Sequence, residues 1–353
     1  MQTGKLSEPV LKRSVLRRLH KGISVQCREY YGADCAAFFP DGRDDGSFCS
    51  HSGGEKPESH HDAVGMACTS VGVPPGFERN PGSLAVAAAN NLLAGGAVPM
   101  SLMLHALIPV SCEETELQRD MEDIAAAADS QGMEILGGHS QVTAAVNETV
   151  YTAVGIGKVC REAGRRLLQP GDELILTKWI ALGGTAALAM NYEEELKHRY
   201  PFALIDQAMK FAGWMSVAEE ARAVDDFGTV AVHDLSQGGI FGALWEMAER
   251  AGTGLEVDLK KIPVRQETIE ICEYFDVNPY ELYSAGSLLI GTEHGETLVR
   301  ELNRRSIPAV IIGRAVKEGG RVIRNGEDVR YLDRPKQDGW YHLQDRRILR
   351  RQP

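Results

Sequence analysis

The sequence predicts an α/β fold, with α+β features, that is divided into two domains. Short strands rich in β-branched residues alternate along the chain with helices that are apolar along one face. The chain has 353 residues, which is more than one hydrophobic core usually organises. Its composition is 43% hydrophobic and 25% charged, as in ordinary globular proteins. These three observations together favour two packed α/β domains.

The first long helix is predicted over residues 111–132. Ser111 and Glu114 have the spacing of a capping box, in which each side chain satisfies a backbone N–H of the other residue. Gly132 can end the helix because glycine adopts the left-handed conformation without strain. We therefore expect the helix to begin close to Ser111 and to end at Gly132.

Two strands are predicted after this helix. Residues 133–140 are apolar and contain the pair Gly137-Gly138, which predicts a short strand ending in a glycine turn. Residues 150–159 are rich in β-branched side chains and predict another strand. Both strands are expected to belong to the first domain.

The boundary between the domains is predicted in the polar and basic stretch 161–173, which contains Pro170 and Gly171. The end of the chain is basic although the protein is acidic; a solvated surface helix or frayed end is favoured there over a site for an acidic partner. We therefore expect an N-terminal domain over 1–160, a C-terminal domain over 168–335 and a basic tail over 336–353.

The second half repeats an order of strand, glycine turn and helix. A strand over 173–179 leads through the glycines of 183–185 into a small-residue helix over 186–190. Residues 229–239 repeat this order, and the helix that follows is apolar on one face and closes at Gly252. Further elements are predicted as a helix over 266–275, a strand over 287–293, a helix over 296–306, a strand over 308–316 and a hairpin that turns at Asn325-Gly326.

Charge and apolar patterning exclude several classes of protein. The formal net charge of −11 argues against binding nucleic acid through its phosphates, so a small ligand is expected. The opening residues show no apolar signal segment, and no stretch reaches the roughly 18 apolar residues that cross a bilayer, so a cytoplasmic protein without membrane contact is expected. The seven cysteines are odd in number and form no CxxC pair, which predicts reduced thiols.

Potential zinc ligands gather between residues 49 and 62. Their spacing fits no standard zinc finger or ribbon, so a polar surface loop is favoured over a metal site. The group consists of Cys49, His51, His60, His61 and Asp62.

Glycine turns at strand ends can bind phosphate, because their backbone N–H groups approach its oxygens, and nearby carboxylates can hold Mg²⁺. One such turn alone is equally well explained as a tight turn, but several in order carry weight. The ordered segments are GKLS (4–7), GADCAAF (32–38), AAANNLLAGGAVP (87–99), GGHS (137–140) and HDLSQGGI (233–240).

The series continues through ALWEMAE (243–249) and NPYELYSAGSLLI (278–290), and it resembles the signature of the aminoimidazole ribonucleotide (AIR) synthase superfamily over about residues 1–335. The resemblance implies the PurM-like fold, in which the N-terminal domains of a homodimer share a β-barrel and the C-terminal domain is an α/β sandwich. It also implies ATP and Mg²⁺ as cofactors. The implied activity is ATP-dependent phosphorylation of a carbonyl or amide-type oxygen, on a small molecule or a protein tail; the alternative is a nucleotide-binding scaffold or regulatory maturation subunit without turnover.

The resemblance also implies roles for individual positions. Asp234 and His233 are the implied catalytic residues, although a histidine at a strand end can equally be a packed one. Lys5 is implied to approach the nucleotide phosphates, and its alternative is an exposed terminal lysine. The implied nucleotide-binding residues are Lys5, Asn90, Gly137, Gly138, Gly238 and Gly239, and the implied metal ligands are Asp34, Asn91 and His139.

Two positions depart from the pattern of the superfamily. Asn91 and His139 stand where aspartate or glutamate is common, and a neutral imidazole is a poor Mg²⁺ ligand. We therefore expect a metal site with fewer carboxylates, or one adapted to another ligand. The sequence ends in RRQP and its last cysteine is Cys272, so the reaction of the HypE branch on its own C-terminal cysteine is not expected.

Overall fold

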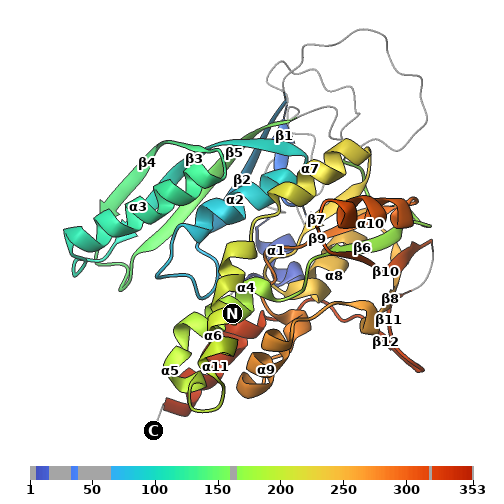
Figure 1. Ribbon diagram of the computed structural model, residues 1–353. Helices are drawn as coiled ribbons and strands as arrows, with labels where there is room; N and C mark the ends of the chain where they lie inside the picture. Colours follow the sequence, from blue (N-terminus) through green and yellow to red (C-terminus); the bar gives the residue numbers. More distant parts are fainter. Residues whose placement is uncertain (1–4, 16–32, 39–64, 160–164, 318–319, 352–353) are drawn as a thin grey trace.

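The computed structural model contains two β-sheets, each with helices packed on it (Figure 1). No helix in the described part of the chain is long and apolar enough to cross a membrane. The group of cysteine and histidine residues between 49 and 62 lies outside the described residues. The structure describes residues 5–15, 33–38, 65–159, 165–317 and 320–351.

The N-terminal sheet has five strands in the order β1-β2-β5-β3-β4, antiparallel except for the β3–β4 pair. Helices α2 and α3 cover one face of this sheet (Figure 1), where Leu84, Leu102 and Ile124 form a core with no exposed surface. The elements are β1 (Ala36–Phe38), β2 (Gly65–Gly72), α2 (Ser83–Ala94), β3 (Ala97–Ile108), α3 (Glu114–Ser130), β4 (Glu134–Val142) and β5 (Val150–Val159).

The other face of this sheet carries exposed apolar side chains. Along the second half of β3, buried and exposed residues alternate, as expected where helices cover only one face. Every residue of β4 is exposed or half-buried. The exposed apolar side chains on this face include Met103, Leu107, Leu136 and Val150.

The C-terminal sheet has seven strands in the order β12-β11-β8-β10-β6-β9-β7. Alternate residues of β9 point to opposite faces: Leu288 packs with α7 and α10, and Leu289 packs with α8. The strands are β6 (Glu173–Thr177), β7 (Ala231–Asp234), β8 (Gly254–Asp258), β9 (Leu288–Thr292), β10 (Ala309–Val316), β11 (Arg321–Asn325) and β12 (Asp328–Tyr331).

A helical layer with its own core adjoins this sheet. Trp340 and Leu343 of α11 are buried in that core beside α4, α6 and α9. The segment after residue 336 thus contains a helix, as one of the two expectations for it stated, and Trp340 and Leu343 bury one face of this helix. Apart from α2 and α3, the α-helices of the described residues are α1 (Glu8–Ser14), α4 (Leu182–Asn191), α5 (Glu193–Leu196), α6 (Phe202–Met209), α7 (Ala218–Phe227), α8 (Gly239–Ala251), α9 (Gln266–Phe275), α10 (Gly295–Arg304) and α11 (Gly339–Arg351).

Two local predictions differ from the structure in instructive ways. The capping box of α3 is formed by Glu113 and Glu116, not by Ser111 and Glu114, because the chain becomes helical only at Glu114. Strand β4 continues through the glycine pair up to Val142. Gly138 lies so close to β3 that a Cβ there would stand 1.6 Å from the carbonyl oxygen of Leu104, so glycine serves close strand approach and not a turn.

Candidate functional site

The candidate site lies where three parts of the chain meet. Strand β7 is an edge strand of the C-terminal sheet and ends in His233 and Asp234. Helix α8 begins after the glycine turn that follows and carries Glu246. Asp34, just before β1, and Lys5, just before α1, approach from the N-terminal part of the chain. Long-range packing thus brings together residues that are up to 241 positions apart.

Four of these side chains form a continuous line of ionic contacts. Lys5 Nζ lies 2.5 Å from Glu246 Oε1, and His233 Nε2 lies 3.3 Å from Glu246 Oε2. The other ring nitrogen, His233 Nδ1, lies 3.0 Å from Asp34 Oδ2. The side chains of His233, Asp34 and Glu246 are all less than 10% exposed, so water screens these contacts little. We call Lys5, Glu246, His233 and Asp34 the ionic chain.

The contacts of the ionic chain shift the pKa values of His233 and Glu246 in opposite directions. Burial opposes the charged imidazole, but the carboxylates of Asp34 and Glu246 outweigh it and raise the pKa of His233 to about 10. Burial would also raise the pKa of Glu246, but Lys5 and His233 lower that pKa to about 2. The ring is therefore an imidazolium held between two carboxylates.

Asp234 is set apart from this chain although it is next to His233 in sequence. Its residue is 3% exposed, and its Oδ1 has no hydrogen-bond partner within the described part of the chain. Burial, together with the nearby charge of Asp34, raises the pKa of Asp234 well above the usual value. Asp234 is thus a buried carboxyl group that binds its proton more tightly than usual and has an oxygen unpaired among the described residues, which suits proton transfer.

The glycine turn after Asp234 is occupied from within the protein. Gly238 and Gly239 both have positive φ, and a Cβ on Gly239 would stand 2.5 Å from the carbonyl oxygen of Tyr280. The N–H of Gly238 donates to Asp338 Oδ2 at 2.7 Å. Burial raises the pKa of Asp338 to about 6, although hydrogen bonds from backbone N–H groups oppose this. An aspartate carboxyl therefore lies where the sequence predicts a nucleotide phosphate.

The two asparagines of α2 point to different places. Asn90 is fully buried; its Nδ2 donates to the carbonyl of Met215 at 2.7 Å, and its Oδ1 accepts from the N–H of Val217 at 3.1 Å. These bonds give Asn90 a structural role between the two halves of the chain. Asn91 donates to the hydroxyl of Thr69, which donates in turn to the backbone carbonyl of Asp34. Only Asn91 therefore adjoins the candidate site.

Comparison with known families agrees with this architecture. The family model "AIR synthase related protein, N-terminal domain" matches residues 59–159, and the corresponding C-terminal domain model matches residues 169–325. The chain belongs to the AIR synthase-related family.

Two relatives are identical to this chain at 28% of the aligned residues. Carbamoyl dehydratase HypE of Rhodobacter capsulatus is 28% identical over 243 residues, which are 67% of this chain and 69% of the relative. A putative hydrogenase expression/formation protein of Methanocaldococcus jannaschii is 28% identical over 251 residues, 69% of this chain and 72% of the relative.

Solved structures in this family confirm the predicted two-domain PurM-like fold. A crystal structure of Escherichia coli HypE has a TM-score of 0.66 at 21% identity and covers 79% of this chain and 88% of its own. HypE in complex with ATP has a TM-score of 0.62 at 19% identity, covering 82% and 90%. The Aquifex aeolicus protein ThiL with AMPPCP and TMP has a TM-score of 0.61 at 16% identity, covering 92% and 97%.

The fourth motif, GGHS (137–140), lies far from Asp34 within one copy of the chain. Gly137, Gly138 and His139 are on β4, one edge of the N-terminal sheet, whereas Asp34 precedes β1 at the other edge. His139 is exposed, and its nearest polar contact is Gln141 Oε1 at 3.4 Å. A single copy therefore does not assemble the motif residues into one site.

The described residues do not fit a Mg²⁺ ion held by the protein itself. They contain no group of three or more histidine, cysteine, aspartate or glutamate side chains arranged around one point. Asp34, the carboxylate expected to hold the ion, is engaged by His233. Asn91 contributes an amide in place of a carboxylate, and His139 lies at the opposite sheet edge.

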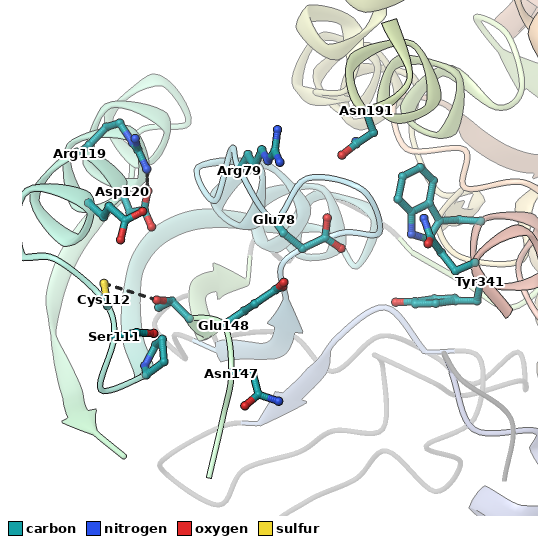
Figure 2. Close-up of a pocket in the computed structure, with 15 residues that line it drawn as sticks. Glu78, Arg79, Ser111, Cys112, Arg119, Asp120, Asn147, Glu148, Asn191 and Tyr341 are labelled. Atoms are coloured by element: carbon teal, nitrogen blue, oxygen red, sulfur yellow. Dashed lines mark hydrogen bonds and ion pairs between the residues drawn. The ribbon is translucent and has the colours of Figure 1, made fainter. Parts of the chain in front are cut away.

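Large cavities lie elsewhere in the molecule. One of about 740 Å³ separates the end of β3 and the start of α3 from Tyr341 of α11 (Figure 2). Figure 2 shows Glu78 and Arg79 between these two walls. None of the predicted site residues lines this cavity. A small cavity of about 40 Å³ touches Asp34 and is lined also by Arg165 and Arg250.

Glu246 and Asp338 were missed by the sequence analysis. Glu246 lies seven residues after Gly239, two helical turns along α8, on the face that is otherwise buried. An acidic residue on an apolar helix face was the available signal for it. Asp338 had no comparable signal, because its partner Gly238 is 100 residues away.

Proposed function

We propose that this protein is an ATP-dependent enzyme that phosphorylates a carbonyl or amide-type oxygen and so makes that oxygen a leaving group. Family membership and the ATP-bound and AMPPCP-bound structures of similar fold support this proposal. The observation that carries it is the buried ionic chain beside Asp234, a buried carboxyl group with one oxygen unpaired among the described residues.

The proposal gives each residue a chemical task. Lys5 is half exposed at the end of the ionic chain and supplies a cation for the nucleotide phosphates. In the reaction the substrate oxygen forms a bond to the γ-phosphorus of ATP while the bond to the β,γ-bridging oxygen breaks and ADP leaves. Asp234 exchanges the proton that the substrate gains or loses in this step. Mg²⁺ enters with ATP as part of the substrate complex.

A homodimer completes the site in this proposal. Within the described residues β1 and β4 are the two free edges of the N-terminal sheet, and its uncovered face is apolar. When two such sheets close into a barrel, β4 of each copy comes beside β1 of the other. His139 and the glycine pair of the second copy would then approach Asp34 and Asn91 of the first. The residues that one copy separates would meet in the dimer.

A second candidate is a nucleotide-binding scaffold or regulatory maturation subunit without turnover. Asn91 and His139 favour it, because both replace carboxylates common in the superfamily. The occupied N–H of Gly238 favours it as well, since a bound phosphate must displace Asp338 to use that donor. The two candidates differ in turnover: only the enzyme converts a substrate, whether that substrate is a small molecule or the tail of a partner protein.

The proposal is tested by measuring ATP binding and ATP turnover separately. Calorimetry should show ATP binding to the parent and to an Asp234→Asn variant, because Asp234 serves proton transfer and not affinity. Release of ADP should fall by at least about a hundredfold in Asp234→Asn, the lower end of what one acid–base group contributes. Binding by the parent without turnover under any metal or candidate substrate would favour the scaffold, and absence of ATP binding would contradict both.

A further inference from the structure

A small cavity lies where the segment between the two domains passes the end of α2 and the edge strand β7. Its volume is about 40 Å³, which exceeds the roughly 10–15 Å³ that one water molecule needs and is far below the roughly 300 Å³ of a pocket for an organic ligand. Arg165, Arg166 and Arg250 line it, together with the start of β1 and Val232 of β7. The cavity therefore has room for one small ion and has three cationic side chains in its wall.

Arg165 is held firmly at one side of this cavity. Its side chain is only 8% exposed, and its Nη2 forms an ion pair with Asp225 of α7 at 2.7 Å. Nε and Nη2 also donate to the carbonyls of Ala94 and Leu93, the last two residues of α2, at 3.0 and 3.1 Å. The remaining nitrogen, Nη1, is buried and has no hydrogen-bond partner in the described part of the chain. A guanidinium can only donate, so Nη1 calls for an acceptor from outside the protein.

The other two arginines of the wall differ in their partners. Arg166 donates two hydrogen bonds to Asp172, at 2.6 and 2.7 Å. Arg250 is half-buried on α8, and no residue in the described ranges forms a hydrogen bond or an ion pair with it. Asp34, the carboxylate in the cavity wall, bonds to His233 instead. The wall therefore contains one arginine charge that no carboxylate of the described chain pairs with.

We propose that this cavity binds one small inorganic anion of the size of chloride, held by Nη1 of Arg165 and by the charge of Arg250. A water molecule would satisfy Nη1 but would leave the charge of Arg250 unpaired, whereas an anion satisfies both. Arginine stays protonated at every pH at which the protein folds, so the site is charged throughout. The anion lies between α2 of the N-terminal domain and α8 of the C-terminal domain and joins them. This role goes beyond the proposed function and does not involve ATP.

The test is thermal unfolding without nucleotide while sodium chloride replaces sodium gluconate at constant ionic strength, because gluconate is too large for the cavity. The unfolding midpoint of the parent should rise by about 2–4 °C between near-zero and saturating chloride, as for a ligand that binds only the folded state. Arg250→Gln removes the unpaired charge and should lose most of this rise. Arg314→Gln is the control and should keep the rise, because Arg314 is an exposed residue of β10 that pairs with Glu256.

Bromide locates the ion directly, and crystals of the parent soaked in sodium bromide should show an anomalous peak beside Nη1 of Arg165. An equal midpoint in chloride and gluconate would overturn the inference, even with a bromide peak, because the ion would then bind at crystal concentration only. An undiminished rise in folded Arg250→Gln, or a water in the cavity of the bromide-soaked crystal, would also overturn it. The measurements on the parent are decisive even if Arg250→Gln does not fold. None of them needs ATP, so failure here is distinct from failure of the proposed enzyme activity.

Discussion

Asn90 and Asn91 are neighbours in sequence, but the helical turn of about 100° per residue directs their side chains to different parts of the molecule. Asn90 uses both its donor and its acceptor on the backbone around Val217, and Asn91 reaches the surroundings of Asp34 through Thr69. Asparagine therefore holds the two halves of the chain together at position 90, and it adjoins the candidate site at position 91.

The Asn90→Asp substitution should destabilise the protein by about 1–3 kcal/mol. It places a carboxylate oxygen against the carbonyl of Met215, where Asn90 now donates a hydrogen bond. Asn91→Asp is the matched control and should cost less, because the Thr69 hydroxyl can rotate and donate to the new carboxylate. Urea unfolding of both variants measures the difference; equal losses of stability would contradict the assigned role of Asn90.

Residue-level prediction from sequence was most useful where a motif supplied the residue itself. Asp34, His233 and Asp234 were all expected at one site and lie together. The sequence did not show that His233 would pair with Asp34, nor that Asp338 would fill the glycine turn, because both contacts join residues 100 or more positions apart. Spacing identifies candidate groups, whereas their partners depend on tertiary packing.

At the scale of elements, the strand β7, its glycine turn and helix α8 form one unit that α11 closes. Asp338 accepts hydrogen bonds from the N–H of Gly238 and from that of Trp340, the second residue of α11. The start of α11 and the start of α8 thus share one buried carboxyl group. The ionisation of this group should influence how firmly α11 is attached.

The contribution of Asp338 to the free energy of unfolding should fall as pH rises from about 4 to about 6. The native pKa of Asp338 is raised to about 6 from an ordinary 3.8, so the folded protein binds this proton more tightly than the unfolded chain. The resulting stabilisation is complete below pH 3.8 and is lost as pH passes 6. The difference in unfolding free energy between the parent and Asp338→Asn should change across this window; a constant difference would refute the prediction.

Element boundaries were predicted well where local sequence determines them. The helix over Gln266–Phe275 and the strand over Val150–Val159 have the expected bounds, and α8 closes at Gly252 with positive φ. The glycine pair in β4 was misinterpreted as a turn; at Gly138 the glycine makes room for the close approach of β3. Local patterns cannot distinguish a glycine that turns from one that leaves room.

At the scale of the whole molecule, the uncovered face of the N-terminal sheet is the feature that a single copy leaves unexplained. Its exposed apolar side chains belong to three adjacent strands, β4, β3 and β5. A sheet face with exposed apolar side chains and free edges is unfavourable in water and is usually covered by another copy or element. The proposed homodimer covers this face and joins the edges.

Light scattering should show a dimer of the parent at micromolar concentration. The Met103→Glu, Leu136→Glu double variant should be a folded monomer, because it places two charges on the face that the dimer buries. Val329→Glu is the control: Val329 is a similarly exposed apolar residue on β12, in the other sheet, and its change should leave the dimer intact. A monomeric parent, or a dimer in all three proteins, would contradict this assembly.

The contacts of α1 also affect how the chain is completed during synthesis. Lys5 pairs with a residue 241 positions later, and the contacts of Glu8 and Lys12 with α8 span 237 positions. At about 5–20 residues per second, these groups wait roughly 10–50 s before their partners leave the ribosome. The first ordered helix of the chain is therefore among the last parts to find its place, and its charges stay accessible to other molecules throughout that interval.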